Sequence, residues 1–202
     1  MRDLFDDARG EFLVPGDYSA DLAKRRLGSG AGSGSWKLER QQSFREPGEP
    51  SWVAFSDGRW DEALRLIEVE RAGLEEYFSA DVGVTYHRVR VVEEPITAYL
   101  HWEFYFLRVA VESGEKIRVV DSNSVRGFET NGVLPELLTI GDDTVYRICY
   151  DDVGVLKGAI RFVDAEITRR CVEFIQDLYA TGDDLGSYFE RKVARLAPPG
   201  AA

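Results

Sequence analysis

Hydrophobic and polar positions alternate most clearly in two short segments, residues 86–92 and 116–121. In the first segment Val89 and Val91 point to one side and Arg88 and Arg90 to the other, as successive side chains of a strand do. The second segment, KIRVVD, alternates in the same way. The pattern therefore predicts two strands of one sheet.

The segment between these strands has helical periodicity over about 16 residues. Pro95 stands just before it, and Thr97 is placed to cap its first turn. Two strands joined through a helix require a crossover connection. We therefore predict a parallel, right-handed strand-helix-strand unit at the centre of the chain.

The helix carries an acidic residue among its apolar side chains. At about 100° per residue, His101, Arg108 and Glu112 form a single solvent-facing stripe, and Glu103 lies almost opposite them. A carboxylate in that position must be paired, hydrogen-bonded or protonated, because an isolated buried charge is too costly. The available partners on the strands are Arg88, Arg90, Arg118, Arg147 and Arg161.

The expected strand parity makes this pairing difficult. The helix should cover the face of Val89, Val91, Ile117 and Val119, and the three arginines Arg88, Arg90 and Arg118 would then point away from it. Glu103 must meet a strand end or another segment, or the assumed parity is wrong. Two interpretations stay open: an ion pair that fixes register, and a tuned carboxylate in a pocket.

The remaining elements follow from weaker patterns. Alternation predicts a short strand at 36–40 that could lie at an edge, and the two prolines of 46–50 predict an irregular turn. Helical spacing predicts a helix at 61–77, with Asp57 as its cap. Residues 134–138 read as a short turn or helix, and strands at 144–150 and 155–162 are joined by a hairpin turn. Two helices with apolar stripes, at 167–178 and 185–196, complete the chain.

These elements define a mixed α/β (α+β) fold with a small mixed sheet, a central strand-helix-strand unit, a following β-hairpin and C-terminal helices. Residues 36–198 form the single domain. Residues 1–35 are expected to be an N-terminal arm detached by the Gly/Ser-rich linker 28–35, and residues 199–202 a tail.

Composition limits the function. The chain has 202 residues, 44% of them hydrophobic, and a formal net charge of −11, which disfavours a nucleic-acid-binding surface. Neither a signal peptide nor an apolar run long enough to cross a membrane is present, so a soluble, cytoplasmic protein is expected. Cys149 and Cys171 lack metal or redox spacing and are expected to be reduced thiols.

Candidate chemistry is sparse. His87 and His101 have no metal-ligand spacing with the cysteines, no nucleophile or phosphate-binding motif is found, and no metal or cofactor is expected. The carboxyl ends of parallel strands are where ligands bind in such sheets, and Glu94 and Asp121 fall there. An ordinary capping turn explains these two acids equally well. The candidate ligand-binding set is Arg88, Arg90, Glu94, Tyr99, Glu103, Arg118 and Asp121.

Several segments carry a family resemblance, among them WKLERQQSFREPGEPSW, RVRVVEEPITAYLHWEF, GEKIRVVD and YDDVGVLKGAIRF. With these, residues 36–198 resemble an actinobacterial, largely streptomycete, family of unknown function. The resemblance implies an accessory role beside helix-turn-helix regulators and supplies no catalytic residues. The order of elements is also loosely like half of a phospholipase-D-type domain, but the chain has no HxK pair.

Two hypotheses of different classes follow. The first is a non-enzymatic interaction or sensing protein that acts with a DNA-binding transcriptional regulator. The second is an enzyme or small-molecule-binding domain with an Arg/Glu pocket at the strand-helix-strand unit. A homodimer formed through the aromatic-rich helix is a further expectation. Whether Glu103 and the arginines line a pocket separates the two main hypotheses.

Overall fold

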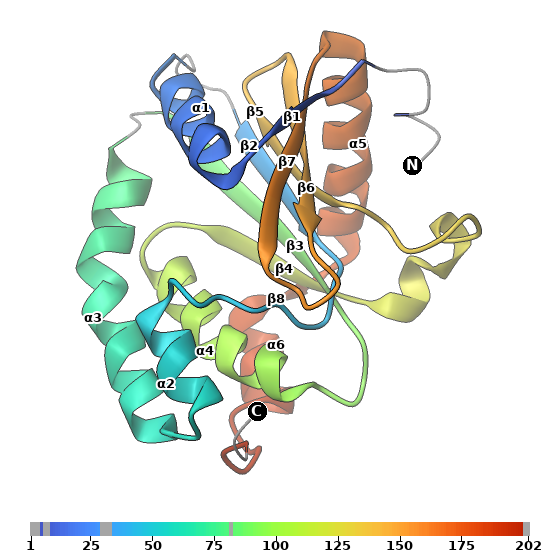
Figure 1. Ribbon diagram of the computed structural model, residues 1–202. Coiled ribbons are helices and arrows are strands. Elements are labelled where there is room, and N and C mark those ends of the chain that lie inside the picture. Colours follow the sequence, from blue (N-terminus) through green and yellow to red (C-terminus); the bar gives the residue numbers. More distant parts are fainter. Residues whose placement is uncertain (1–4, 6–8, 29–33, 81–82, 200–202) are drawn as a thin grey trace.

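The computed structural model describes residues 5, 9–28, 34–80 and 83–199 and contains one mixed sheet flanked by helices (Figure 1). The sheet has the strand order β1-β7-β6-β5-β2-β3-β4-β8. Its strands are β1 (Glu11–Leu13), β2 (Gly34–Glu39), β3 (Thr85–Val92), β4 (Lys116–Asp121), β5 (Glu136–Ile140), β6 (Thr144–Tyr150), β7 (Leu156–Val163) and β8 (Asp183–Asp184).

The helices come from segments with helical periodicity and recognisable caps. Thr97 caps the central helix by accepting a hydrogen bond from the backbone N–H of Leu100, and Asp164 caps the long C-terminal helix in the same way. The helices are α1 (Pro15–Gly28), α2 (Pro50–Ser56), α3 (Trp60–Ser79), α4 (Ala98–Glu112), α5 (Ala165–Thr181) and α6 (Leu185–Lys192), with 3-10 turns η2 (Ser122–Ser124) and η3 (Arg126–Phe128).

Strands β2, β3 and β4 are parallel to one another, and every other pairing is antiparallel. The predicted parallel unit β3-α4-β4 is thereby confirmed, as is the hairpin of β6 and β7. The α+β fold class is confirmed as well.

The two faces of the sheet are covered differently (Figure 1). Helix α5 covers one face, where Cys171 and Ile175 pack on Val89 and Val91. On the other face, α4 and α6 pack on Ile117 of β4 and on its neighbours, and α2 and α3 pack in turn against α4. Because helices lie on both sides, most side chains of the central strands are buried.

Three local predictions are wrong, and one helix was not predicted. The strand at 36–40 is not an edge, because β2 lies between β5 and β3. Residues 136–140 form strand β5 rather than a turn or helix, and residues 50–56 form helix α2 directly after the predicted turn. Asp57 ends α2 and does not cap α3. For β2 and β5, tertiary pairing outweighs a weak local signal.

The predicted solvent stripe of α4 is also wrong at His101, which is only 4% exposed. Its ring lies 4.8 Å from that of Trp60, at the start of α3. The prediction identified correctly the side of α4 that faces away from the sheet. That side is nevertheless buried, because α3 packs across it. Burial lowers the pKa of His101 accordingly.

The N-terminal region is not a detached arm where it is described. Strand β1 pairs with β7, and the ring of Tyr18 on α1 lies 5.2 Å from that of Tyr146 on β6. Asp21 of α1 forms an ion pair of 2.6 Å with Arg161. Most of the predicted Gly/Ser-rich linker, residues 29–33, lies outside the described residues.

Two simple expectations concern the cysteines and the membrane. Both Cys149 and Cys171 are free, as predicted, and Cys171 lies on the buried side of α5. Among the described helices, none combines the length and the apolar character needed to cross a bilayer.

Candidate functional site

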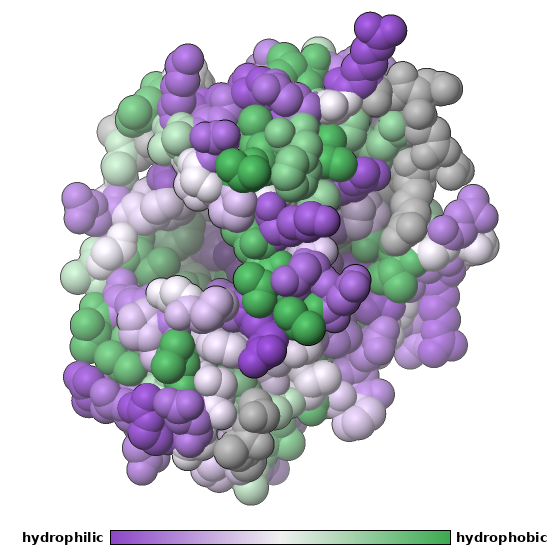
Figure 2. All heavy atoms as spheres, in the orientation of Figure 1, coloured by the Kyte–Doolittle hydropathy of each residue, from purple (hydrophilic) through white to green (hydrophobic). Residues whose placement is uncertain are grey.

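A cavity of about 580 Å³ lies on the α4 side of the sheet. Its walls come from β2, β3, the segment 44–49, α4 and the hairpin of β6 and β7, with Pro15 of α1 at one side. Figure 2 shows this face of the molecule hollowed between α1 and the segment that leads into α2. We call it the charged cavity, because Lys37, Glu39, Arg88 and Glu103 line it.

Charged side chains of adjacent parallel strands form its floor. Lys37 Nζ lies 2.6 Å and Arg88 Nη1 lies 3.0 Å from the carboxylate of Glu39. Arg88 Nε also lies 2.8 Å from Oε1 of Glu115, the residue just before β4. Burial opposes ionisation of Glu39, but the two cations outweigh it and lower its pKa. The floor is therefore a closed set of ion pairs.

Glu103 finds its partner on the strand face that α4 covers. Arg90 Nε lies 2.7 Å from Glu103 Oε2, and the side chain of Arg90 is completely buried. The assumed parity was thus wrong: in the observed register Arg90 pairs with Val119, so both face α4, whereas Val89 and Val91 face α5. Burial raises the pKa of Glu103, although Arg90 lowers it in part.

The hydroxyl of Tyr99 lies between two carboxylates. It is 2.5 Å from Glu46 Oε1 and 3.2 Å from Glu103 Oε1. A phenol has a single proton to donate, so it can satisfy one carboxylate at a time. Burial raises the pKa of Glu46. When Glu46 is protonated it can donate to Tyr99, which then donates to Glu103; when Glu46 is ionised, Tyr99 can turn to it instead.

The segment between β2 and α2 forms the rim of the cavity and is held at several points. The amide of Gln42 donates to the carbonyl of Val91, and Thr97 Oγ1 donates to the carbonyl of Gln42. Arg40 forms ion pairs of 2.6 Å with Glu93 and 2.7 Å with Glu129. These contacts fix the segment to the end of β3 and to the start of α4, so the rim has a defined position.

Three carboxyl groups gather at this rim. Glu46 and Glu49 line the cavity, and Glu70 of α3 is close enough to Glu49 for the two carboxyl groups to interact. Burial, together with the neighbouring carboxyl of Glu49, raises the pKa of Glu70 to about 8. Among the described residues no Lys or Arg forms an ion pair with any of the three. The carboxyl group of Glu70 therefore holds its proton at neutral pH.

The predicted candidate set is only partly brought together. Arg88, Arg90, Tyr99 and Glu103 meet at the charged cavity, with Arg90 behind its wall. The other three lie elsewhere. Arg118 is on the α5 face over the ring of Tyr179, Glu94 pairs with Lys192, and Asp121 caps the turn η2.

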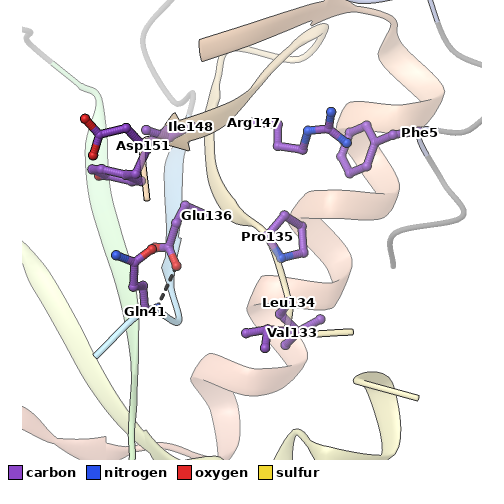
Figure 3. A pocket seen from close by; sticks show the side chains of 10 residues that line it. Phe5, Gln41, Val133, Leu134, Pro135, Glu136, Arg147, Ile148 and Asp151 are labelled. Atoms are coloured by element: carbon purple, nitrogen blue, oxygen red, sulfur yellow. Dashed lines mark hydrogen bonds between the residues drawn. The ribbon is translucent and has the colours of Figure 1, made fainter. Parts of the chain in front are cut away.

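A second cavity of about 630 Å³ opens where β5 begins and β6 ends. Figure 3 shows Glu136 and Gln41 on one side of it and Arg147 and Phe5 on the other. Glu136 is 7% exposed, and its Oε1 accepts hydrogen bonds from the backbone N–H groups of Arg40 and Gln41. Its Oε2 has no hydrogen-bond partner in the described part of the chain. Burial raises the pKa of Glu136 to about 7.

Sequence reasoning missed the residues that complete the charged cavity, namely Lys37, Glu39, Phe44, Glu46, Glu49, Glu115 and Tyr150. The sequence does contain a signal for Lys37 and Glu39. Charged side chains at alternating positions are unusual in a strand that lies at the centre of a sheet. No comparable signal marked the rim. Within the described ranges, no group of three or more His, Cys, Asp or Glu side chains is placed to hold a metal ion.

The architecture and the cavity define a single-sheet α+β domain with a buried ionic network on one face. The chain belongs to the family described as a domain of unknown function, DUF6879, whose model matches residues 23–190. The match starts within α1 and ends within α6, and it includes the charged cavity except for Pro15. The expected membership of a family of unknown function is thus confirmed.

Other comparisons add little. A search of curated proteins gave no match. Among solved structures, the chain is similar to a phospholipase D family member, Nuc from Salmonella typhimurium, with 13% sequence identity and a TM-score of 0.45. The similarity covers 88% of this chain and 98% of that one. At this level the likeness supports no conclusion about activity.

Proposed function

We propose that the protein is a non-enzymatic small-molecule-binding domain whose ligand site is the charged cavity. The observation that carries the proposal is that Glu39, Arg88 and Glu103, all buried in ion pairs, line a cavity of about 580 Å³. Ligand pockets usually have volumes between about 300 and 1,000 Å³, with apolar walls and a few fixed polar groups.

The energetics support a use for these charges. A buried ion pair contributes little net stability, because desolvation offsets the attraction between its charges. Apolar side chains of similar volume would serve the fold equally well or better. A set of paired charges beside an open volume is therefore more easily explained by recognition than by packing alone.

The ion pairs also favour binding over catalysis. Lys37, Arg88 and Arg90 are each engaged by a carboxylate, so their charges hold one another in place. Such groups form a rigid polar surface against which a ligand can be oriented. Catalysis by the carboxyl groups of raised pKa, Glu46 and Glu103, is the alternative.

Association with a helix-turn-helix regulator stays a prediction from the sequence. The net charge of −11 is consistent with regulation through a partner rather than by direct DNA contact. A test is co-purification with a candidate regulator at stoichiometric ratio. Its absence across the regulators of the source organism would count against this role.

The binding proposal is tested with a metabolite panel of cationic, anionic and neutral compounds. An added Cβ at Gly48, on the rim of the cavity, would meet no atom within 4 Å, so Gly48→Trp places a bulky ring there without backbone strain. Gly73 on α3 is equally open and does not line the cavity, so Gly73→Trp is the matched control.

At least one compound should raise the melting temperature of the wild type and of Gly73→Trp, but not that of Gly48→Trp. A ligand present at about 100 times its dissociation constant adds about 2.7 kcal/mol, which corresponds to a shift of roughly 5–10 °C for a domain of this size. Equal shifts in both variants, or no shift with any compound, would refute the proposal.

A further inference from the structure

We propose that the ligand of the charged cavity is an organic cation, an amine or quaternary ammonium group attached to an apolar body. This inference rests on the proposed function and names the class of ligand. It comes from the distribution of charge around the cavity. On the floor, the basic and acidic side chains neutralise one another, whereas the acidic side chains of the rim have no basic partner among the described residues.

On the floor, each cation already has its carboxylate. Lys37 and Arg88 are held by Glu39, at 2.6 and 3.0 Å. Arg88 is also held by Glu115, and Arg90 behind the wall is held by Glu103. An anionic ligand would have to compete with these carboxylates for the same guanidinium and ammonium groups. The floor is thus poorly suited to binding a phosphate or a carboxylate.

On the rim, acidic groups are in excess. Glu46, Glu49 and Glu70 lack an ion-pair partner among the described residues, and Glu46 and Glu49 line the cavity itself. Arg45, the remaining cation of the lining, is exposed and forms no ion pair with them in the described structure. A ligand cation would supply the missing positive charge.

Aromatic rings stand beside these acids. Phe44, Tyr99, Trp102, Phe106 and Tyr150 all line the cavity. The ring of Phe44 lies 4.5 Å from that of Tyr150 and 5.5 Å from that of Tyr99. Faces of aromatic rings attract cations, and groups of several rings bind quaternary ammonium ligands in other proteins. A bare metal ion would leave most of this apolar volume unfilled.

The hydrogen bonds of Tyr99 provide a response to such a ligand. A cation at the rim favours the ionised form of Glu46. The hydroxyl of Tyr99 can then donate its hydrogen bond to Glu46, 2.5 Å away, instead of to Glu103. Glu103 keeps its ion pair with Arg90. The ligand is therefore recognised by Glu46 and by the rings, while the floor stays unchanged.

The test uses three probes that share a phenyl group: 2-phenylethylamine, 2-phenylethanol and 3-phenylpropionate. Binding to the full chain is measured by calorimetry at pH 8, with Mg²⁺ as a fourth probe. The amine should bind at least about tenfold more tightly than the alcohol, and the carboxylate should not bind. Glu46→Gln should weaken amine binding about tenfold, whereas Glu75→Gln, an equal change of charge on the exposed side of α3, should leave it unchanged.

The outcomes separate this inference from the proposed function. If the alcohol or the carboxylate binds as well as the amine, and Gly48→Trp abolishes that binding, the cavity is a ligand site but not one for cations. Tighter binding of Mg²⁺, or an unchanged amine affinity in a folded Glu46→Gln variant, also overturns the inference. If neither these probes nor the metabolite panel bind, both proposals fail.

Discussion

The carboxylate of Glu103 on α4 lies 2.7 Å from Nε of Arg90 on β3, the strand that directly precedes this helix in the chain. Both side chains are almost completely shielded from water. Removing one partner leaves a buried charge without compensation, which costs about 3–5 kcal/mol.

We therefore expect Glu103→Ala to lower the free energy of unfolding by about 3–5 kcal/mol, measured by urea denaturation at pH 7. The double variant Arg90→Met/Glu103→Leu should lose much less than the sum of the single changes. Arg65→Ala removes an exposed ion pair with Glu62 and should change the stability very little. A double variant as unstable as that sum would contradict the assigned pairing.

Tyr99 is expected to stabilise the fold through its hydroxyl group. Tyr99→Phe removes the donor that Glu46 and Glu103 share, and the cost of leaving a buried acceptor unpaired is about 1–3 kcal/mol. Tyr150→Phe is the control, because that ring lines the same cavity and its hydroxyl has no hydrogen-bond partner among the described residues. Equal losses for the two variants in thermal unfolding would show that the hydroxyl of Tyr99 has no special role.

Glu136 should make stability depend on pH. Burial raises its pKa from the ordinary value of 4.5 to about 7 in the folded chain. Between these two pH values the unfolded chain releases the proton and the folded chain retains it, so this group reduces stability as the pH rises. The loss is complete above pH 7 and is on the order of 1–3 kcal/mol.

Glu136→Gln removes that loss. The free energy of unfolding of the variant, minus that of the wild type, should therefore be larger at pH 8 than at pH 5. Chemical denaturation of both proteins at the two pH values measures this difference. Glu75→Gln, which changes an exposed side chain, should show no such difference. A difference of opposite sign would mean that Glu136 is ionised in the folded protein at pH 5.

The two thiols should differ in reactivity. Burial raises the pKa of Cys171 to about 12, and the residue is completely enclosed, whereas Cys149 is half-buried. A thiol reagent at pH 8 should modify Cys149 in the native protein and Cys171 only after unfolding. A Cys149→Ser variant that still reacts within minutes would show that α5 opens readily.

The sequence predicted the central unit well because its signals are local. Alternation within β3 and β4, and the cap at Thr97, depend on neighbours along the chain. The same reasoning correctly singled out Glu103 and its need for a partner. It failed on which strand face α4 covers, because valines alternate with arginines on β3 and both faces are buried.

The rim of the cavity could not be predicted for a different reason. Glu46 and Glu49 belong to a segment without periodicity, and their position is set by Gln42 and Arg40, which bind residues far away in the chain. The central position of β2 likewise depends on β5, about a hundred residues later. Long-range contacts of this kind leave no mark in local composition.

The separation of the two faces has a practical consequence. Helix α5 covers the face opposite the charged cavity, and Glu173 and Asp177 lie on its exposed side. A fluorophore or a surface anchor attached at Asp177 would leave the cavity open, and the body of the sheet would lie between the label and the ligand. Immobilised protein could thus be screened with its binding face presented to solution.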